Sequence, residues 1–293
     1  MSAAALVRRV SRRIDKTIAS WIFIDQWIIL TGKNLDYRSL DWNGFQPLIP
    51  PKDRYWGDPF ILHKGECYYL FIEEKLYATG RGRIVCLTLG GDGSLLSQQV
   101  VLERPYHLSY PFVFEHGTEL CMVPETAGNR TIELYRCTHF PDRWEFAGNL
   151  LTDIYAVDAT LLRHEGKWWL FANVKEPGGS SLDALHLYYT AGDLLAGNWT
   201  PHPRNPIVKD ISSARPGGRI FQVDGSLIRP SQDSSSRYGY ALKFSRITAL
   251  SETEYAEEPV KGFTPLGSRY RATHTFNRDG EITVVDAVLR RRK

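Results

Sequence analysis

The sequence has no hydrophobic run long enough to cross a membrane as a helix. Its longest apolar stretch, residues 21–30, is interrupted by Asp25, whereas a spanning helix needs about 20 predominantly apolar residues. The basic N-terminal region is not followed by an apolar signal core or by a small-residue cleavage site, so a secretory signal is not indicated. These absences predict a soluble, cytoplasmic protein.

Cysteine is scarce, and its four copies stand apart. Each lies in a strand-like run and none forms a Cys-x-x-Cys pair, so a zinc site is not indicated. We expect free thiols in a reducing compartment, with disulfides between neighbouring repeats as the alternative. Histidine-rich metal spacing, glycine-rich nucleotide loops and a Gly-x-Ser-x-Gly elbow are also absent. The sequence therefore predicts no metal and no cofactor.

Neither sign of charge dominates the sequence. The 36 Lys and Arg against 33 Asp and Glu leave a net charge of +3, which gives no field that favours nucleic acid. Residues 3–20 place apolar side chains at helical spacing with arginines opposite, which predicts a basic amphipathic helix over residues 1–20. Such a helix either packs on the protein or contacts an anionic membrane surface peripherally.

Aromatic residues, by contrast, are plentiful, at 12% with 8 Trp and 15 Tyr. Tyr and Trp favour strands. Most of them fill cores, but an aromatic face also packs on the C–H face of a sugar ring.

From residue 21 onward, short apolar runs alternate with tight polar turns. Three hairpins share one plan, Asp58–Phe71, Tyr110–Val123 and Asp158–Phe171, and each turns at a polar residue followed or preceded by glycine. Weaker copies are Asp224–Leu242 and Thr273–Leu289. Five units at a period of about fifty residues predict an all-β, five-bladed β-propeller as a single domain. That domain spans residues 21–293, and residues 21–30 form the strand that closes the ring with the last blade.

The starts of the inner strands are the candidate site. In a propeller these starts converge on the central axis, and Asp58, Tyr110, Asp158 and Asp224 are expected at or near them. Two carboxylates brought together in this way could perform acid–base chemistry on a glycosidic bond, because repulsion and burial separate their pKa values. The alternative is that each Asp caps its own strand or turn.

Other polar residues accompany these starts. Glu125 follows Pro124 at the end of a second strand, where the neighbouring units carry Glu73, Glu74, Asn173 and Lys175. His107 could carry a proton or bind sugar, and an arginine fork binds carboxylate or phosphate. The substrate-binding candidates are Trp56, His107, Tyr110, Arg215, Asp224, Arg229 and Gln232. Each has a structural alternative in core packing or pairing with a neighbour.

A family resemblance rests on long runs of sequence. The runs YWGDPFILHKGECYYLFIEE, HLSYPFVF, VPET, VDATLLRHEGKWWLF and RPSQD are similar to the N-terminal domain associated with glucosamine inositolphosphorylceramide transferases. The resemblance extends from about residue 21 to the C-terminus. The transferase domain that follows in such proteins has no counterpart here, so its activity is not carried over.

A wider resemblance is to the five-bladed propeller glycosidases of the furanosidase and xylosidase group. It implies that Asp58, in its Asp-Pro context, is a general base or nucleophile and that Asp158 orients and tunes it. Those enzymes supply a general-acid glutamate about sixty residues further on, where this chain reads ARPGGRIFQVDG without glutamate. Either Glu125 or Asp224 then acts as the acid, or the chain does not hydrolyse glycosides.

The sequence thus predicts a carbohydrate-active propeller that cleaves or transfers a glycosyl unit, with Asp58, Asp158 and Glu125 as catalytic residues. Its partner would be a carbohydrate, or a sugar-containing lipid or polysaccharide precursor. Two alternatives stay open: a non-catalytic module that binds a glycan or glycolipid head group, and a platform for protein partners.

Overall fold

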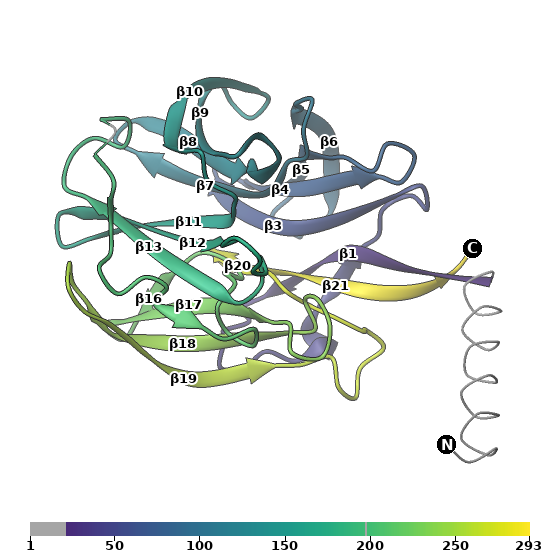
Figure 1. Ribbon diagram of the computed structural model, residues 1–293. Helices are drawn as coiled ribbons and strands as arrows, with labels where there is room; N and C mark the ends of the chain where they lie inside the picture. The colour runs from purple at the N-terminus through teal and green to yellow at the C-terminus, as the bar shows by residue number, and fades with distance from the viewer. Residues whose placement is uncertain (1–21, 197) are drawn as a thin grey trace, which may run out of the picture.

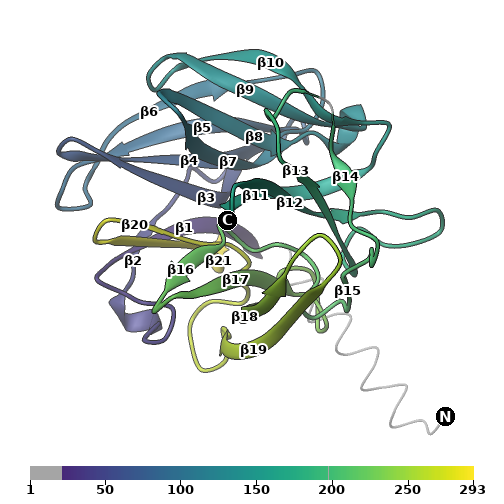
Figure 2. The same ribbon diagram turned by 90° about the vertical axis from the view of Figure 1, so that its left-hand side faces the viewer.

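Five antiparallel sheets surround a common axis in the computed structural model, which describes residues 22–196 and 198–293 (Figure 1). The turned view shows the sheets side by side as blades (Figure 2). The prediction of an all-β, five-bladed propeller is confirmed. The helix predicted over residues 1–20 lies outside the described residues. No helix among the described residues is long and apolar enough to span a membrane.

The first three blades follow the chain from the axis outward. Blade one consists of β3 (Arg54–Lys64), β4 (Cys67–Leu76), β5 (Gly82–Leu89) and β6 (Leu95–Leu102). Blade two consists of β7 (Ser109–His116), β8 (Glu119–Glu125), the short 3-10 helix η2 (Ala127–Asn129), β9 (Thr131–His139) and β10 (Arg143–Thr152). Blade three consists of β11 (Ala156–His164), β12 (Lys167–Val174), β13 (Ala184–Thr190), β14 (Thr200–Pro201) and β15 (Val208–Lys209).

The last two blades complete the ring. Blade four consists of β16 (Phe221–Val223), β17 (Ser226–Asp233), β18 (Ala241–Leu250) and β19 (Tyr255–Phe263). Blade five combines both ends of the described chain: β20 (Phe276–Asp279), β21 (Ile282–Arg292), β1 (Phe23–Lys33), the 3-10 helix η1 (Trp42–Gly44) and β2 (Gln46–Leu48). Strand β1 pairs with β21 over its whole length, from Phe23 opposite Arg292 to Lys33 opposite Ile282, which confirms the predicted closing strand.

Aromatic side chains fill the space between blades. The ring of Phe60 in blade one lies 4.8 Å from that of Tyr110 and 5.6 Å from that of Phe112 in blade two, both edge-on. All three residues are buried. Edge-on pairs add to the burial of apolar area, so these contacts hold neighbouring inner strands together. The four cysteines are free.

The inner strands of blades one to three share an irregularity where they begin. The pairing register shifts between Gly57 and Phe60, and equivalent shifts occur in the next two blades. Asp58, Tyr110 and Asp158, which lie within these bulges, have φ values of 49°, 43° and 54°. A bulge redirects a side chain, and left-handed backbone at a residue other than glycine costs about 1–3 kcal/mol. The fold therefore holds three side chains in a strained, repeated position.

The fourth repeat does not begin where the sequence suggests. Asp224 lies in the hairpin turn between β16 and β17, at the opposite end of the inner strand from Asp58. Counted back from the inner hairpins, the residue that matches Asp58 is Gly217. The prediction that Asp224 opens an inner strand is wrong, because blade four has an inner strand of only three residues.

Candidate active site

Asp58 lies at the centre of a buried polar cluster at one end of the axis. Its Oδ1 accepts a hydrogen bond of 2.8 Å from the Thr275 hydroxyl, and its Oδ2 accepts one of 3.2 Å from the Tyr110 amide. Burial raises the pKa of Asp58 to about 6, and the nearby carboxylates of Asp158 and Asp286 act in the same direction against the positive His274. Asp58 therefore changes charge just below neutral pH.

Asp158 occupies the matching position in blade three and is held by two side chains from blade four. Arg215 donates from Nε at 2.6 Å and from its Nη2 at 3.2 Å, one bond to each carboxylate oxygen. Gln232 donates a further bond of 2.8 Å to Oδ2. A bidentate arginine and an amide together fix the orientation of this carboxylate.

Glu125, from β8, completes this arrangement. Its Oε2 lies 3.8 Å from the same Arg215 guanidinium. Burial raises the pKa of Glu125 well above its ordinary value, and the charges of Asp158 and Asp58 add to that increase while Arg215 opposes it. Glu125 thus lies beside Asp158 with its pKa raised well above the ordinary value.

His274 and Asp286 from blade five lie on the other side of Asp58. The Nδ1 of His274 is 2.6 Å from Asp286 Oδ2 and 3.7 Å from Asp58 Oδ1. Burial lowers the pKa of His274, but the two carboxylates outweigh burial and raise it to about 9. One potential metal-ligand atom from each of these three residues lies within 4.8 Å of the others. An imidazolium that donates from Nδ1 has no lone pair there for a metal, so the geometry describes an ion pair.

Glu73 occupies the position in blade one that Glu125 occupies in blade two. It accepts a hydrogen bond of 2.9 Å from the Tyr55 hydroxyl and lies 3.3 Å from His107 Nε2. Burial, and next the charge of Asp58, raise the pKa of Glu73 to about 8. His107 Nδ1 accepts from the Gly82 amide, and burial lowers the pKa of His107 to about 4, so His107 is neutral beside Glu73.

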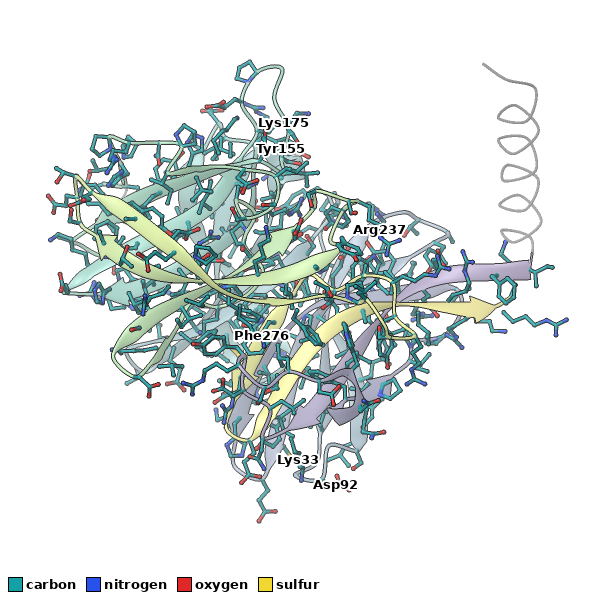
Figure 3. The ribbon with its side chains drawn as sticks, turned by 90° about the horizontal axis from the view of Figure 1, so that it is seen from below. Lys33, Asp92, Tyr155, Lys175, Arg237 and Phe276 are labelled. Carbon is teal, nitrogen blue, oxygen red and sulfur yellow. The ribbon has the colours of Figure 1, made fainter. Side chains whose placement is uncertain are left out.

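Tyr238 connects the cluster to solvent. It lies between β17 and β18, its ring centroid is 5.1 Å from the Arg215 guanidinium carbon, and it meets the His274 ring edge-on at 5.4 Å. The cluster is otherwise largely buried, whereas Tyr238 is 45% exposed. Figure 3 labels its neighbour Arg237, together with Tyr155 and Lys175, far from Lys33 and Asp92 at the other end of the molecule. The outer face of Tyr238 is therefore open to a ligand.

Comparison with known proteins identifies the family. Residues 51–284 match the family model described as glucosamine inositolphosphorylceramide transferase 1, N-terminal. This chain belongs to that family. Glucosamine inositolphosphorylceramide transferase 1 from Oryza sativa subsp. japonica is 38% identical over 208 residues, and the protein of that name from Arabidopsis thaliana is 36% identical over 210 residues. The match covers 70% of this chain but only 28% and 27% of those relatives.

Solved structures share the fold of this family member at low identity. A family 117 glycoside hydrolase from Zobellia galactanivorans has a TM-score of 0.56 with 12% identity, and covers 90% of both chains. A family 32 β-fructofuranosidase from Bombyx mori has a TM-score of 0.57 with 14% identity, over 97% of this chain and 62% of that one. At such identities the likeness shows a common fold alone.

The structure brings together some of the site residues predicted from the sequence of this family member, and separates others. Asp58, Asp158, Glu125, Arg215 and Gln232 meet in one cluster, with His107 at its edge. Tyr110 is fully buried beneath the cluster. Its hydroxyl shares a hydrogen bond with the Thr160 hydroxyl and accepts another from the Gly218 amide.

Three predicted residues lie elsewhere. Trp56 is buried and donates its indole N–H to Glu74. Arg229 is buried in blade four and pairs with Glu257 at 2.5 Å. Asp224 has an exposed side chain at the far end of the axis and pairs with Arg38. None of the three reaches the cluster, so the structure corrects their assignment to a shared substrate site.

Sequence reasoning missed the contribution of blade five. Residues 273–275, in the run THTF, directly precede the last inner strand, β20, and the glycine turn at Gly280 was recognisable. Counting back from that turn to the position of Asp58 leads to Thr273, beside His274. Asp286, in β21, and Tyr238, in the loop between β17 and β18, had no comparable signal, because neither lies in a motif that recurs in the other repeats.

Proposed function

We propose that this chain is a carbohydrate-active propeller that cleaves or transfers a glycosyl unit at the cluster around Asp58, Asp158 and Glu125. The observation that carries the proposal is the pairing of Asp58, which has a pKa of about 6, with Glu125, whose pKa burial raises well above its ordinary value. Glycosidic bond cleavage needs one carboxyl group that gives a proton and one carboxylate that activates water or attacks carbon.

The roles follow from the contacts. Asp58 loses its proton above pH 6, so it serves as the base or nucleophile. Glu125 protonates the oxygen of the leaving group. Asp158 is fixed by Arg215 and Gln232, and its charge adds to the raised pKa of Glu125. Tyr238 supplies an aromatic face for the sugar ring at the exposed side of the cluster.

A second candidate function is binding without turnover, and a specific observation favours it. Both oxygens of Asp58 already accept hydrogen bonds from the protein, and so do both oxygens of Asp158. The blade-four position that matches Asp58 is Gly217, which supplies no carboxyl group. In this reading the chain binds a glycan or glycolipid head group, a ligand class that agrees with the names of the plant relatives.

One experiment separates the two functions. Wild type, Asp58→Asn and Glu125→Gln are assayed on activated aryl glycosides and on unactivated glycosides, and their binding is measured on a glycan array. Asp92→Asn, an exposed change at the far end of the molecule, is the matched control. For the enzyme, Asp58→Asn abolishes turnover and keeps sugar affinity, because the amide preserves the shape.

The Glu125→Gln variant tests the acid. Loss of general acid catalysis costs about 10²–10⁴ in rate, and the loss is concentrated on substrates with poor leaving groups. Equal losses on both substrate kinds would remove Glu125 from that role. Glycan binding by wild type without turnover of any substrate would refute the enzyme and support the binding module.

A further inference from the structure

A cavity lies at the opposite end of the propeller axis from the Asp58 cluster. It has a volume of about 250 Å³ and opens between the inner strands of blades four and five. Its lining includes the inner hairpin residues Val223 and Gly280, which mark the far end of the axis. Phe276, which also lines the cavity, lies in the middle of the molecule in Figure 3. This cavity plays no part in the function proposed above.

Arg219 is the most distinctive residue of this cavity. Its chain segment precedes β16 in blade four, yet its guanidinium reaches across the axis to blade two. There it donates to the Val113 carbonyl, and its Cζ lies over the Phe112 ring, 5.1 Å from the centroid. The Arg219 amide donates to Asn277 Oδ1, and Asn277 in turn donates to the Pro59 carbonyl. The backbone of Arg219 is thus fixed between blades.

The charge of Arg219 has no ion-pair partner among the described residues. A guanidinium has five N–H donors, of which one donates to the Val113 carbonyl. Burial lowers the pKa of Arg219 against the more distant attraction of Asp279 and Glu115. Arg219 is half-buried, so its unpaired cation is partly desolvated at a cost in free energy, and an anion in the cavity would reduce that cost.

The acidic residues that line the cavity are already partnered. Asp36 forms an ion pair of 3.1 Å with Arg38, and Asp279 accepts a hydrogen bond of 2.7 Å from the His63 amide. The lining also contains Arg219 and Arg278, whose positive charges balance these two carboxylates. The lining therefore has no net charge. A ligand with a single anionic group fits this balance better than a polyanion.

The walls and the volume define the rest of the ligand. Tyr37, Phe221, Val223 and Phe276 give the cavity apolar and aromatic surfaces. Its volume is below the roughly 300–1,000 Å³ of sites for drug-sized ligands, so it admits a molecule of about one ring.

From this geometry we infer that the cavity is a second ligand site, in which Arg219 binds the carboxylate or phosphate of a small ring compound, such as an acidic monosaccharide, while the aromatic walls contact the ring. A guanidinium fork recognises both oxyanions.

Calorimetric titration of the full chain tests the site. The probes are glucuronic acid, glucose 6-phosphate and inorganic phosphate, with glucose as the neutral match. We expect binding of at least one charged ring compound and at least tenfold weaker binding of glucose. Arg219→Gln should lower the affinity at least tenfold. Inorganic phosphate that binds as well as the acidic sugars would show that the walls do not contribute, and would overturn the ring part of the inference.

Further variants keep the test independent of folding and of the other site. Val223→Glu adds a carboxylate to the cavity lining without altering Arg219, and should also weaken the anion at least tenfold. Arg246→Gln, an exposed arginine of blade four paired with Glu258, should leave affinity unchanged. Asp58→Asn should change turnover or glycan binding at the first site only. The inference is overturned if no charged probe binds, if glucose binds equally well, if Arg219→Gln and Val223→Glu bind as wild type does, or if Asp58→Asn removes the binding.

Discussion

The ion pair between His274 and Asp286 makes stability depend on pH. His274 has a pKa of about 9 in the folded chain, compared with about 6.5 when unfolded. Below pH 6.5 the imidazole is protonated in both states, and its contribution to the free energy of unfolding is complete. As the pH rises to about 9, the unfolded state has already lost this proton and the folded state must follow. Stability therefore falls across the range from 6.5 to 9.

The size of the effect follows from the difference between the two pKa values. A difference of 2.5 (9 − 6.5) corresponds to about 3 kcal/mol at roughly 1.4 kcal/mol for each pKa unit. At an unfolding entropy of about 2.1 cal/mol/K per residue, this free energy lowers the Tm of a 293-residue chain by about 5 °C. The raised pKa of Glu73, about 8, acts in the same direction between pH 4.5 and 8, so wild type alone does not isolate His274.

The assay compares wild type with His274→Gln by calorimetric melting between pH 6 and 9.5. We expect the variant to melt about 5 °C below wild type at pH 6.5 and the gap to narrow toward pH 9. His139→Gln, which alters an exposed histidine, should follow wild type throughout. A gap that is constant across this range would refute the assignment of the charge to His274, and a wild-type Tm that rises with pH would refute its sign.

Two further predictions concern the frame around the cluster. Gly218→Ala should unfold or aggregate the chain, because the added Cβ would lie 1.9 Å from the Phe276 carbonyl oxygen, at a φ of 135°. The control is Gly65→Ala, at a φ of 64° with nothing within 4 Å of the added Cβ. In urea unfolding this control should lose only about 1–2 kcal/mol of stability. Arg229→Met should cost about 3 kcal/mol, because it removes the cation that pairs with the largely buried Glu257 carboxylate and leaves it the Tyr255 hydroxyl as donor. Adding Glu257→Leu should restore part of this loss, and a double variant no more stable than the single one would contradict the argument.

The fold was largely predictable because its inner hairpins are so regular. In blades one to three and five a glycine marks each inner turn, and the closing strand is apolar. The start of the inner strand of blade four was predicted wrongly, for a physical reason. Its inner strand, β16, has three residues, and the Ser-rich loop at 234–240 joins its second and third strands instead. A long polar turn in the sequence does not reveal which pair of strands it connects.

The candidate site was predictable only where repeat positions were equivalent. Asp58 and Asp158 occupy matching positions in blades one and three, and these positions share one end of the axis. Glu125 reaches the same end because it pairs with Ser109, the residue before Tyr110, which is the blade-two match of Asp58. Trp56, two residues before Asp58, would face the same side in a regular strand. The bulge between Gly57 and Phe60 breaks this alternation and leaves Trp56 in the core. Bulges of this kind depend on how the backbones of two strands pair. The residue pattern of a single strand does not predict them.

The pairing of β1 with β21 has a consequence for how the molecule folds. Blades one to four are each built from consecutive residues, whereas blade five needs segments from opposite ends of the described chain. Closing so long a loop has an entropic cost before any contact forms. We expect the fifth blade to assemble last, with β21 exposing an unpaired edge until then. Hydrogen exchange during refolding would find the β1 amides protected after those of β4 and β8, and their earlier protection would contradict this order. During synthesis β1 is made before all the other strands, but it cannot pair until β21 is complete. In that interval β1 of one chain can pair with β21 of another, which would produce a strand-swapped dimer.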